Sequence, residues 1–182
     1  MYKYMSVLFI IFLILGLGGN SVLSQPGMGP MGNGQMMEPI NSEYEFLIKM
    51  IPHHEEAVYT AKILKENTNR KEMKDFADKI IETQSREIEQ MKIWLDKWYA
   101  NRENNYEYQA MMDDYEGLKG EQLDQAFLED MIFHHMSAVM MSQQLIIKGL
   151  AEHEEVYELA KNIRNNQRNE IFQMREWLVS WY

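Results

Sequence analysis

The sequence predicts an all-α fold, a four-helix bundle built from two repeated helical hairpins. Three observations predict it: apolar residues recur at helical spacing, no segment alternates like a strand, and one motif occurs twice. FLIKMIPHH at 46–54 returns as FLEDMIFHH at 127–135, at a shift of 81 residues. Further along, 84–99 matches 167–182 at a shift of 83. Four amphipathic helices with this symmetry are typical of a bundle that builds its ligand site from facing helices.

The two repeats, at 44–99 and 125–182, each have the pattern of two helices joined by a short turn. A polar residue can cap the first helix, a run of Asn and Thr turns the chain, and Gly149 ends the third helix. The expected helices run from a cap at Asn41 or Ser42 to about Glu66, from about Arg70 to Tyr99, from about Gln122 to Lys148, and from about Glu154 to the end. Because one repeat is too small to fold comfortably alone, we expect a single domain at 41–182.

The N-terminal residues differ in composition from the rest of the chain. Residues 1–24 combine Lys3 with an apolar run too short for a comfortable membrane span, which is typical of a signal peptide. This predicts an exported protein, periplasmic or extracellular, that contacts the membrane only if this segment stays uncleaved. Residues 25–40 are rich in Gly, Pro and Met and are expected to be flexible. Their thioethers suit Cu(I), so a plain tether and a copper-catching tether both stay open.

Composition excludes several classes of function. The net charge of -10 argues against a nucleic-acid partner, which would require a basic surface. Without cysteine the chain forms no disulfide, no thiolate metal site and no nucleophilic thiol. Methionine is abundant, at 16 of 182 residues, and its thioether is the sulfur ligand that remains for a soft metal ion.

A methionine precedes a histidine pair by one helical turn in both repeats. The methionine and the second histidine are spaced i and i+4, so a thioether and an imidazole can share one ion. The first histidine of each pair points about 100° further round the helix. The sequence leaves open whether the two pairs meet or form separate sites. The candidate metal ligands at these positions are Met50, His53, His54, Met131, His134 and His135.

Two further sets of residues complete the predicted site. Met136 and Met140 are spaced i and i+4 and are candidate sulfur ligands, with core packing as the other interpretation. On the partner helices an amide and an acid recur, and a ligating histidine commonly donates its second N–H to a carboxylate. These supporting residues are Gln84, Glu87, Gln167 and Glu170. A structural hydrogen-bond network of His and Glu without metal is the alternative.

The segments MIPHHEEAV and MIFHHMSAV, each followed by a helix with Q-x-x-E-I-x-x-M-x-x-W-L, resemble an exported bacterial family known as a domain of unknown function. Copper-binding proteins of the CopM type are similar. The resemblance covers about residues 42–182 and implies a ferritin-like four-helix bundle with a role in copper tolerance. The family pattern matches this chain at the histidine pairs, at Met50 and Met131, and at the supporting Gln and Glu residues.

We therefore expect a chelator of copper ions, as Cu(I) or Cu(II), and not an enzyme. A di-metal oxidoreductase is one alternative, but it would require a Glu-x-x-His pattern that the ligand helices lack. A metal-free interaction module, which would use the tyrosines from Tyr106 to Tyr115, is the other. The sequence leaves the formation of a homo-oligomer open.

Overall fold

The computed structural model describes residues 39–182 of the chain. The predicted signal peptide at 1–24 and most of the predicted flexible segment at 25–40 lie outside the described residues. Within 39–182 the structure is all-α and has no strand, as predicted. No helix in this part combines the length and apolar character that a membrane span requires. The four helices are α1 (Glu43–Asn67), α2 (Lys71–Trp98), α3 (Gly120–Ile147) and α4 (Glu154–Trp181).

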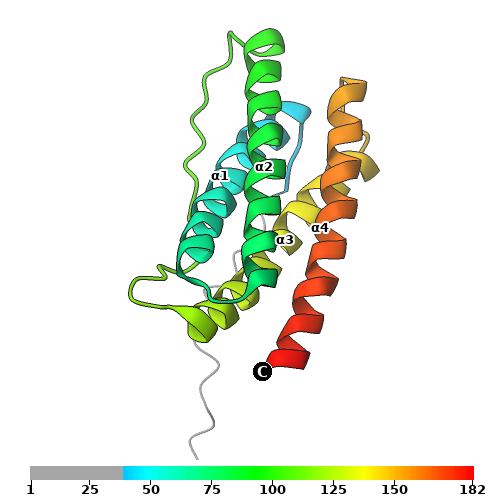
Figure 1. The fold of residues 1–182 in the computed structure, drawn as a ribbon. Helices are drawn as coiled ribbons and strands as arrows, with labels where there is room; N and C mark the ends of the chain where they lie inside the picture. The colour runs from blue at the N-terminus through cyan, green and yellow to red at the C-terminus, as the bar shows by residue number, and fades with distance from the viewer. Residues whose placement is uncertain (1–38) are drawn as a thin grey trace, which may run out of the picture. The chain divides into compact units, whose positions relative to one another are not determined.

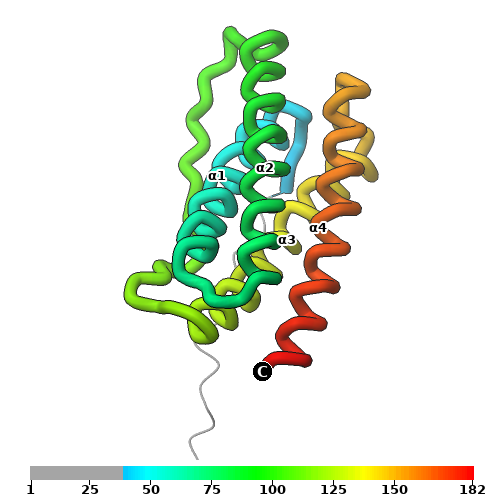
Figure 2. The backbone as a smooth tube through the Cα atoms, viewed as in Figure 1, coloured from blue at the N-terminus to red at the C-terminus, as the bar shows by residue number. Residues whose placement is uncertain are grey.

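The helices form two hairpins, α1 with α2 and α3 with α4, that pack on each other mainly through α1 and α3. Figure 1 shows α1 and α3 crossing behind α2 and α4. The connection at 99–119 runs back along α1, as the tube in Figure 2 shows, so α3 begins at the same end as α2. This route makes α1 antiparallel to α3, and the middle of one helix therefore lies against the middle of the other.

The helix ends use the signals present in the sequence. The Ser42 hydroxyl caps α1 by accepting the N–H of Glu45 at 3.1 Å. Directly after α3, Gly149 has a φ of 62°, and the next amide donates to the carbonyl of Leu145 at 3.0 Å. A residue with a side chain would be strained in this left-handed conformation, which explains why the third helix ends at a glycine.

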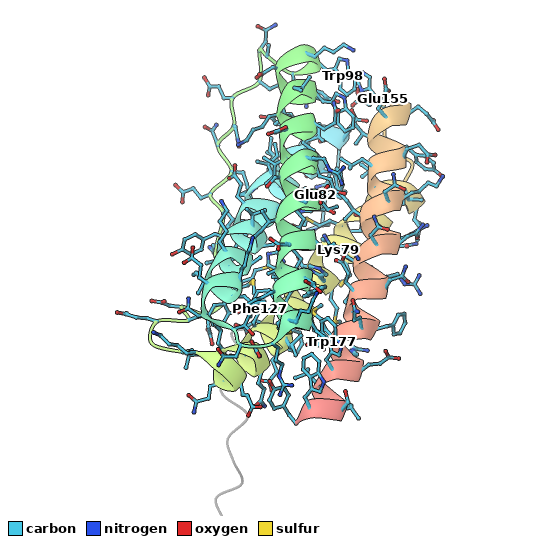
Figure 3. The ribbon with its side chains drawn as sticks, viewed as in Figure 1. Lys79, Glu82, Trp98, Phe127, Glu155 and Trp177 are labelled. Atoms are coloured by element: carbon cyan, nitrogen blue, oxygen red, sulfur yellow. The ribbon has the colours of Figure 1, made fainter. Side chains whose placement is uncertain are left out.

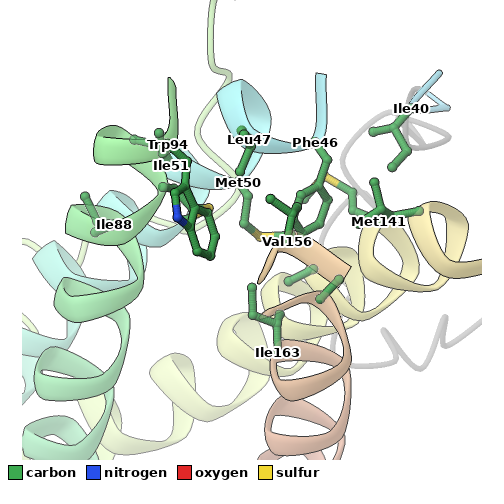
Figure 4. Packing of buried hydrophobic residues seen from close by; sticks show 14 of the residues in the cluster. Ile40, Phe46, Leu47, Met50, Ile51, Ile88, Trp94, Met141, Val156 and Ile163 are labelled. Carbon is green, nitrogen blue, oxygen red and sulfur yellow. The ribbon is translucent and has the colours of Figure 1, made fainter. Parts of the chain in front are cut away.

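A layer of polar side chains divides the core into two apolar clusters. Figure 4 shows one cluster, which includes Phe46, Trp94 and Val156. The second cluster includes Phe127 and Met174 at the other end of the bundle. Along each helix, the polar residues separate most members of one cluster from those of the other. This polar layer consists of His53, His54, Gln84, Glu87, His134, His135, Gln167 and Glu170.

One end of the bundle is closed by an acid and a histidine from different hairpins. Glu43, at the start of α1, is fully buried and accepts hydrogen bonds from His153 Nδ1 at 2.7 Å and the Tyr99 hydroxyl at 3.0 Å. The His153 ring stacks on Trp98, with ring centroids 3.5 Å apart. The acidic run around His153 in the sequence gives no sign of this contact.

The opposite end has the same arrangement with an arginine in place of the histidine. Asp124, near the start of α3, is fully buried, and Arg70 Nε lies 3.6 Å from its carboxylate. The Arg70 guanidinium also lies over the Trp181 ring, 4.6 Å from the centroid. At both ends an acid of one hairpin therefore meets the residue that precedes the second helix of the other.

Candidate metal centre

The structure brings the two histidine pairs together where α1 and α3 meet. His53 and His134 stack with ring centroids 3.7 Å apart, and each is 1% exposed. His54 and His135 are fully buried, and their centroids lie 6.1 and 6.2 Å from those of the preceding histidines. The question that the sequence left open is therefore answered, because the four imidazoles form one cluster in the polar layer.

A carboxylate on each partner helix holds one imidazole of this cluster. His54 Nε2 lies 2.8 Å from Glu87 Oε2 on α2, and His135 Nε2 lies 2.9 Å from Glu170 Oε2 on α4. Because a carboxylate only accepts, Nε2 carries the proton in both rings, and Nδ1 presents its lone pair in the neutral ring. This is the contact expected of a carboxylate that orients a ligating histidine.

The two stacked rings are held differently. His53 Nε2 donates to the backbone carbonyl of His134 at 3.0 Å, so its Nδ1 also presents a lone pair. His134 Nε2 lies 3.2 Å from Glu56 Oε2, in a contact that is poorly aligned for a hydrogen bond. In all four histidines Nδ1 is buried and has no hydrogen-bond partner among residues 39–182. Buried polar atoms without partners are rare, because leaving them unsatisfied is costly.

Glu56 is the residue at the cluster that the sequence analysis missed. Its Oε2 accepts the Tyr108 hydroxyl in addition to its contact with His134. Its Oε1 accepts the backbone N–H groups of Met111 and Met112 at 2.9 and 3.1 Å. One carboxylate on α1 therefore fastens the connection and contacts the imidazole cluster.

Comparison of the two repeats does not identify Glu56. The second repeat has Ser137 at the position that corresponds to Glu56, so the comparison of repeats singles out no acid there. The available signal was spacing, since Glu56 follows His53 by three residues and therefore lies on the same helical face.

The predicted sulfur ligands fall into two groups. Met50 and Met131 are fully buried, one turn before the histidines that the carboxylates hold. Met136 and Met140 are 36% and 50% exposed, and the Met136 sulfur lies 3.9 Å from an Arg175 nitrogen. The structure does not bring Met136 and Met140 into the buried imidazole cluster.

The environment keeps the stacked imidazoles neutral. Burial, reinforced by the neighbouring His134, holds the pKa of His53 well below its usual value. Burial also lowers the pKa of His134 to about 4, although the contact with Glu56 opposes this shift. Burial alone would raise the pKa of Glu170, but hydrogen bonds from His135 and Lys79 bring it below its usual value. Neutral imidazoles beside ionised carboxylates have the protonation state that metal binding requires.

Two amide side chains join the carboxylates at a narrow cavity between α2 and α4. Gln84 and Gln167 are each 3% exposed, and their Oε1 atoms are buried and accept no hydrogen bond from any residue that the structure describes. With Glu87 and Glu170 they line a cavity of about 10 Å³, which is close to the room needed for one water molecule. The four supporting residues of the sequence analysis therefore lie around one space.

Among residues 39–182, no three or more His, Asp and Glu side chains are grouped as a metal site of nitrogen and oxygen ligands would require. The buried thioethers of Met50 and Met131 lie one helical turn before His54 and His135 and are the sulfur donors on that helical face. A mixture of nitrogen and sulfur donors suits copper better than hard cations.

The comparisons with known proteins show which family the chain belongs to. The chain matches the family model of DUF305, a domain of unknown function, over residues 43–178. The chain belongs to the DUF305 family. The comparison of this DUF305 protein with curated proteins finds no match.

Solved structures resemble this DUF305 protein over most of its length. CopM in the Cu(I)-bound form has a TM-score of 0.69 and 33% identity, and the match covers 79% of this chain and 99% of CopM. CopM in the Cu(II)-bound form has a TM-score of 0.67 and 32% identity, covering 78% and 99%. A DUF305 fragment from Deinococcus radiodurans has a TM-score of 0.66 and 26% identity, covering 78% and 98%. The similarity to CopM supports a metal-related role.

Proposed function

We propose that this DUF305 protein binds copper ions outside the cytoplasm and lowers their free concentration or passes them on, as part of copper tolerance or trafficking. One observation carries the proposal: four buried imidazole Nδ1 atoms have no hydrogen-bond partner within the described part of the chain. A protein that only needed packing at this layer would be more stable with apolar side chains there. A bound cation would give these lone pairs a partner.

The donor types favour copper over other metal ions. His54 and His135 each follow a buried methionine by one turn, so each hairpin offers a nitrogen and a sulfur donor on one helical face. Thioether sulfur is a soft ligand suited to Cu(I), and imidazole binds both copper oxidation states. CopM has been solved with Cu(I) and with Cu(II), which supports the same choice of ion for this relative. The net charge of -10 attracts cations in general.

Export is part of the proposal and is supported by the sequence of residues 1–24. If this segment is a cleaved signal peptide, the protein recovered from the periplasm or medium of its host begins at Gln25. Sequencing of that N-terminus checks the proposal, and recovery of the whole protein from the cytoplasm with an intact Met1 would contradict it.

The metal-binding proposal is tested by competition for Cu(I) with a chromophoric chelator. The wild type is expected to retain Cu(I), and the double variant His54→Leu and His135→Leu to lose it, because both oriented imidazoles are gone. The matched control is His153→Gln, which removes the fifth histidine without changing the cluster. Circular dichroism verifies that each variant is folded, and equal retention by the double variant would overturn the assignment.

A second double variant separates the sulfur ligands from the nitrogen ligands. Met50→Leu with Met131→Leu preserves core volume, and such exchanges usually cost less than about 1.5 kcal/mol. We expect this variant to weaken Cu(I) binding far more than Cu(II) binding, since Cu(II) depends less on thioether ligands than Cu(I) does. The combination Met136→Leu with Met140→Leu, on the exposed part of α3, tests the other predicted sulfur pair in the same assay.

A further inference from the structure

An ion bound at the imidazole cluster must first cross a layer of protein, because each ring is at most 1% exposed. The helix pairs α1 with α2, α3 with α4 and α1 with α3 are extensively packed. The cavity of about 10 Å³ lies instead between α2 and α4. We call this cavity and its lining the seam. Its lining includes Glu87 and Glu170, whose carboxylates hold His54 and His135.

Six of the eight residues that line the seam are polar, and the seam lies in the polar layer between the two apolar clusters. Gln84 and Gln167 line it from α2 and α4, nearly fully buried, and their Oε1 atoms have no hydrogen-bond partner within residues 39–182. Amide and carboxylate oxygens are hard ligands that hold Cu(I) weakly. They can therefore replace part of the hydration shell of a passing ion without trapping it. The polar lining residues are Thr83, Gln84, Glu87, Asn166, Gln167 and Glu170.

A lysine links the two helices beside the seam. Lys79 on α2 is 57% exposed, and its Nζ lies 3.0 Å from Glu170 Oε1 on α4. Figure 3 shows Lys79 on α2 at the height where α4 passes beside it. Its ammonium group joins the helices across the seam and repels an approaching cation. The corresponding position in the second repeat is the uncharged Asn162, so only one of the two related positions carries this charge.

We propose that the seam is the passage by which the metal ion reaches the imidazoles, and that the Lys79–Glu170 ion pair is its gate. Gln84, Gln167 and Glu87 act as transient oxygen ligands along the way. The inference rests on the proposed function, since it concerns how copper enters and leaves that site. Opening the gate requires the loss of one ion pair whose lysine is 57% exposed, while Glu170 keeps its hydrogen bond with His135.

The test measures the rates of copper transfer in the full protein. Release is followed by stopped-flow absorbance, with Cu(I)-loaded protein mixed into a chromophoric chelator at concentrations where the rate no longer depends on the chelator. Uptake is followed from a weak Cu(I) complex. Lys79→Ala is expected to speed uptake and release alike, by about fivefold or more, because a lower barrier acts in both directions. Asn166→Phe, which fills the exposed side of the seam, is expected to slow both.

Lys65→Ala is the matched control. Lys65 is 48% exposed and pairs across helices with Asp78, so its loss removes the same charge and an ion pair between helices outside the seam. The proposed passage is overturned if Lys79→Ala and Lys65→Ala change the rates of copper uptake and release equally. It is also overturned if Lys79→Ala speeds uptake but slows release, because that result is expected from simple charge attraction. A second cavity, of about 490 Å³, is lined by Glu56 and Tyr108 among others. The proposed passage is also overturned if Tyr108→Ala, which removes part of the lining of this second cavity, accelerates transfer in place of Lys79→Ala. Failure of the wild type to hold copper would instead overturn the proposed function.

Discussion

Glu56 serves the imidazole cluster and the long connection with a single carboxylate. Its two oxygens accept the Tyr108 hydroxyl and two backbone amides, and one of them also lies against His134. Burial would raise the pKa of Glu56, but its contacts with His134 and Tyr108 bring it below the usual value. The group is therefore an ionised hydrogen-bond acceptor, and its removal leaves several donors unpaired at once.

Replacing this carboxylate should loosen the connection. We expect Glu56→Ala to lower the free energy of unfolding by about 2 to 4 kcal/mol, because partly buried donors lose a charged acceptor. The amides of Met111 and Met112 should also exchange faster with deuterium, which mass spectrometry measures. Glu55→Ala is the control, since Glu55 is half exposed and pairs within residues 39–182 with Lys92 alone, and should cost about 1 kcal/mol or less. Equal losses in the two variants would contradict this account.

The stacked histidines predict a loss of stability in acid. The folded-state pKa of His53 and that of His134, about 4, lie below the unfolded value of 6.5. Between these values the unfolded chain binds more protons, so stability is complete above pH 6.5 and falls as the pH drops towards 4. Urea unfolding of the metal-free protein at a series of pH values measures the effect, which is on the order of 3 kcal/mol for His134 alone. The double variant His53→Gln and His134→Gln should show a flatter profile, and an unchanged profile would refute this origin.

At the scale of helices, the turn between α3 and α4 depends on a backbone conformation. Gly149 donates its N–H to the carbonyl of Ile146, and Leu150 donates to that of Leu145, while Gly149 itself is left-handed. Together these bonds satisfy carbonyls at the end of α3 that would otherwise lack partners. The turn also places His153 where it can reach Glu43 at the start of α1.

Substitutions at this turn should rank by their tolerance of positive φ. Gly149→Ala is expected to lower the free energy of unfolding by about 1 to 2 kcal/mol, because its Cβ disfavours the left-handed conformation. Space is not the cause, since a Cβ at this position would meet no atom within 4 Å. Gly149→Asn should cost less, as asparagine adopts this conformation more readily. Chemical denaturation measures both, and a larger loss for asparagine would be evidence against backbone strain.

For the whole molecule, copper should stabilise the fold if it binds the folded state alone. A free Cu(I) concentration one hundred times Kd adds about 2.7 kcal/mol to the free energy of unfolding. Calorimetry with buffered Cu(I) checks this, and His54→Leu with His135→Leu should remove the gain. Unchanged thermal stability of the wild type with copper, zinc and iron would favour the metal-free interaction module.

The sequence predicted the helices well because their signals are local. Each predicted helix boundary lies within two residues of the observed one, since periodicity and capping residues mark it directly. It did not predict that His53 stacks on His134, because that depends on how α1 crosses α3, a contact between residues 81 positions apart. The sequence also did not predict that Met136 and Met140 are exposed, since i and i+4 spacing identifies a shared helical face but not what covers that face.

The ion pairs between hairpins at the two ends of the bundle also bear on how two molecules of this protein could form a domain-swapped dimer. Glu43 pairs with His153 of the other hairpin, and Asp124 pairs with Arg70 of the other hairpin. An isolated hairpin would therefore lack a partner for a charged residue at each of its ends. The corresponding hairpin of a second molecule would supply the same partners. A straightened connection at 99–119 would permit such a domain-swapped dimer. The bonds that fasten the connection to Glu56 oppose that exchange, because they keep the two hairpins of one chain close to each other.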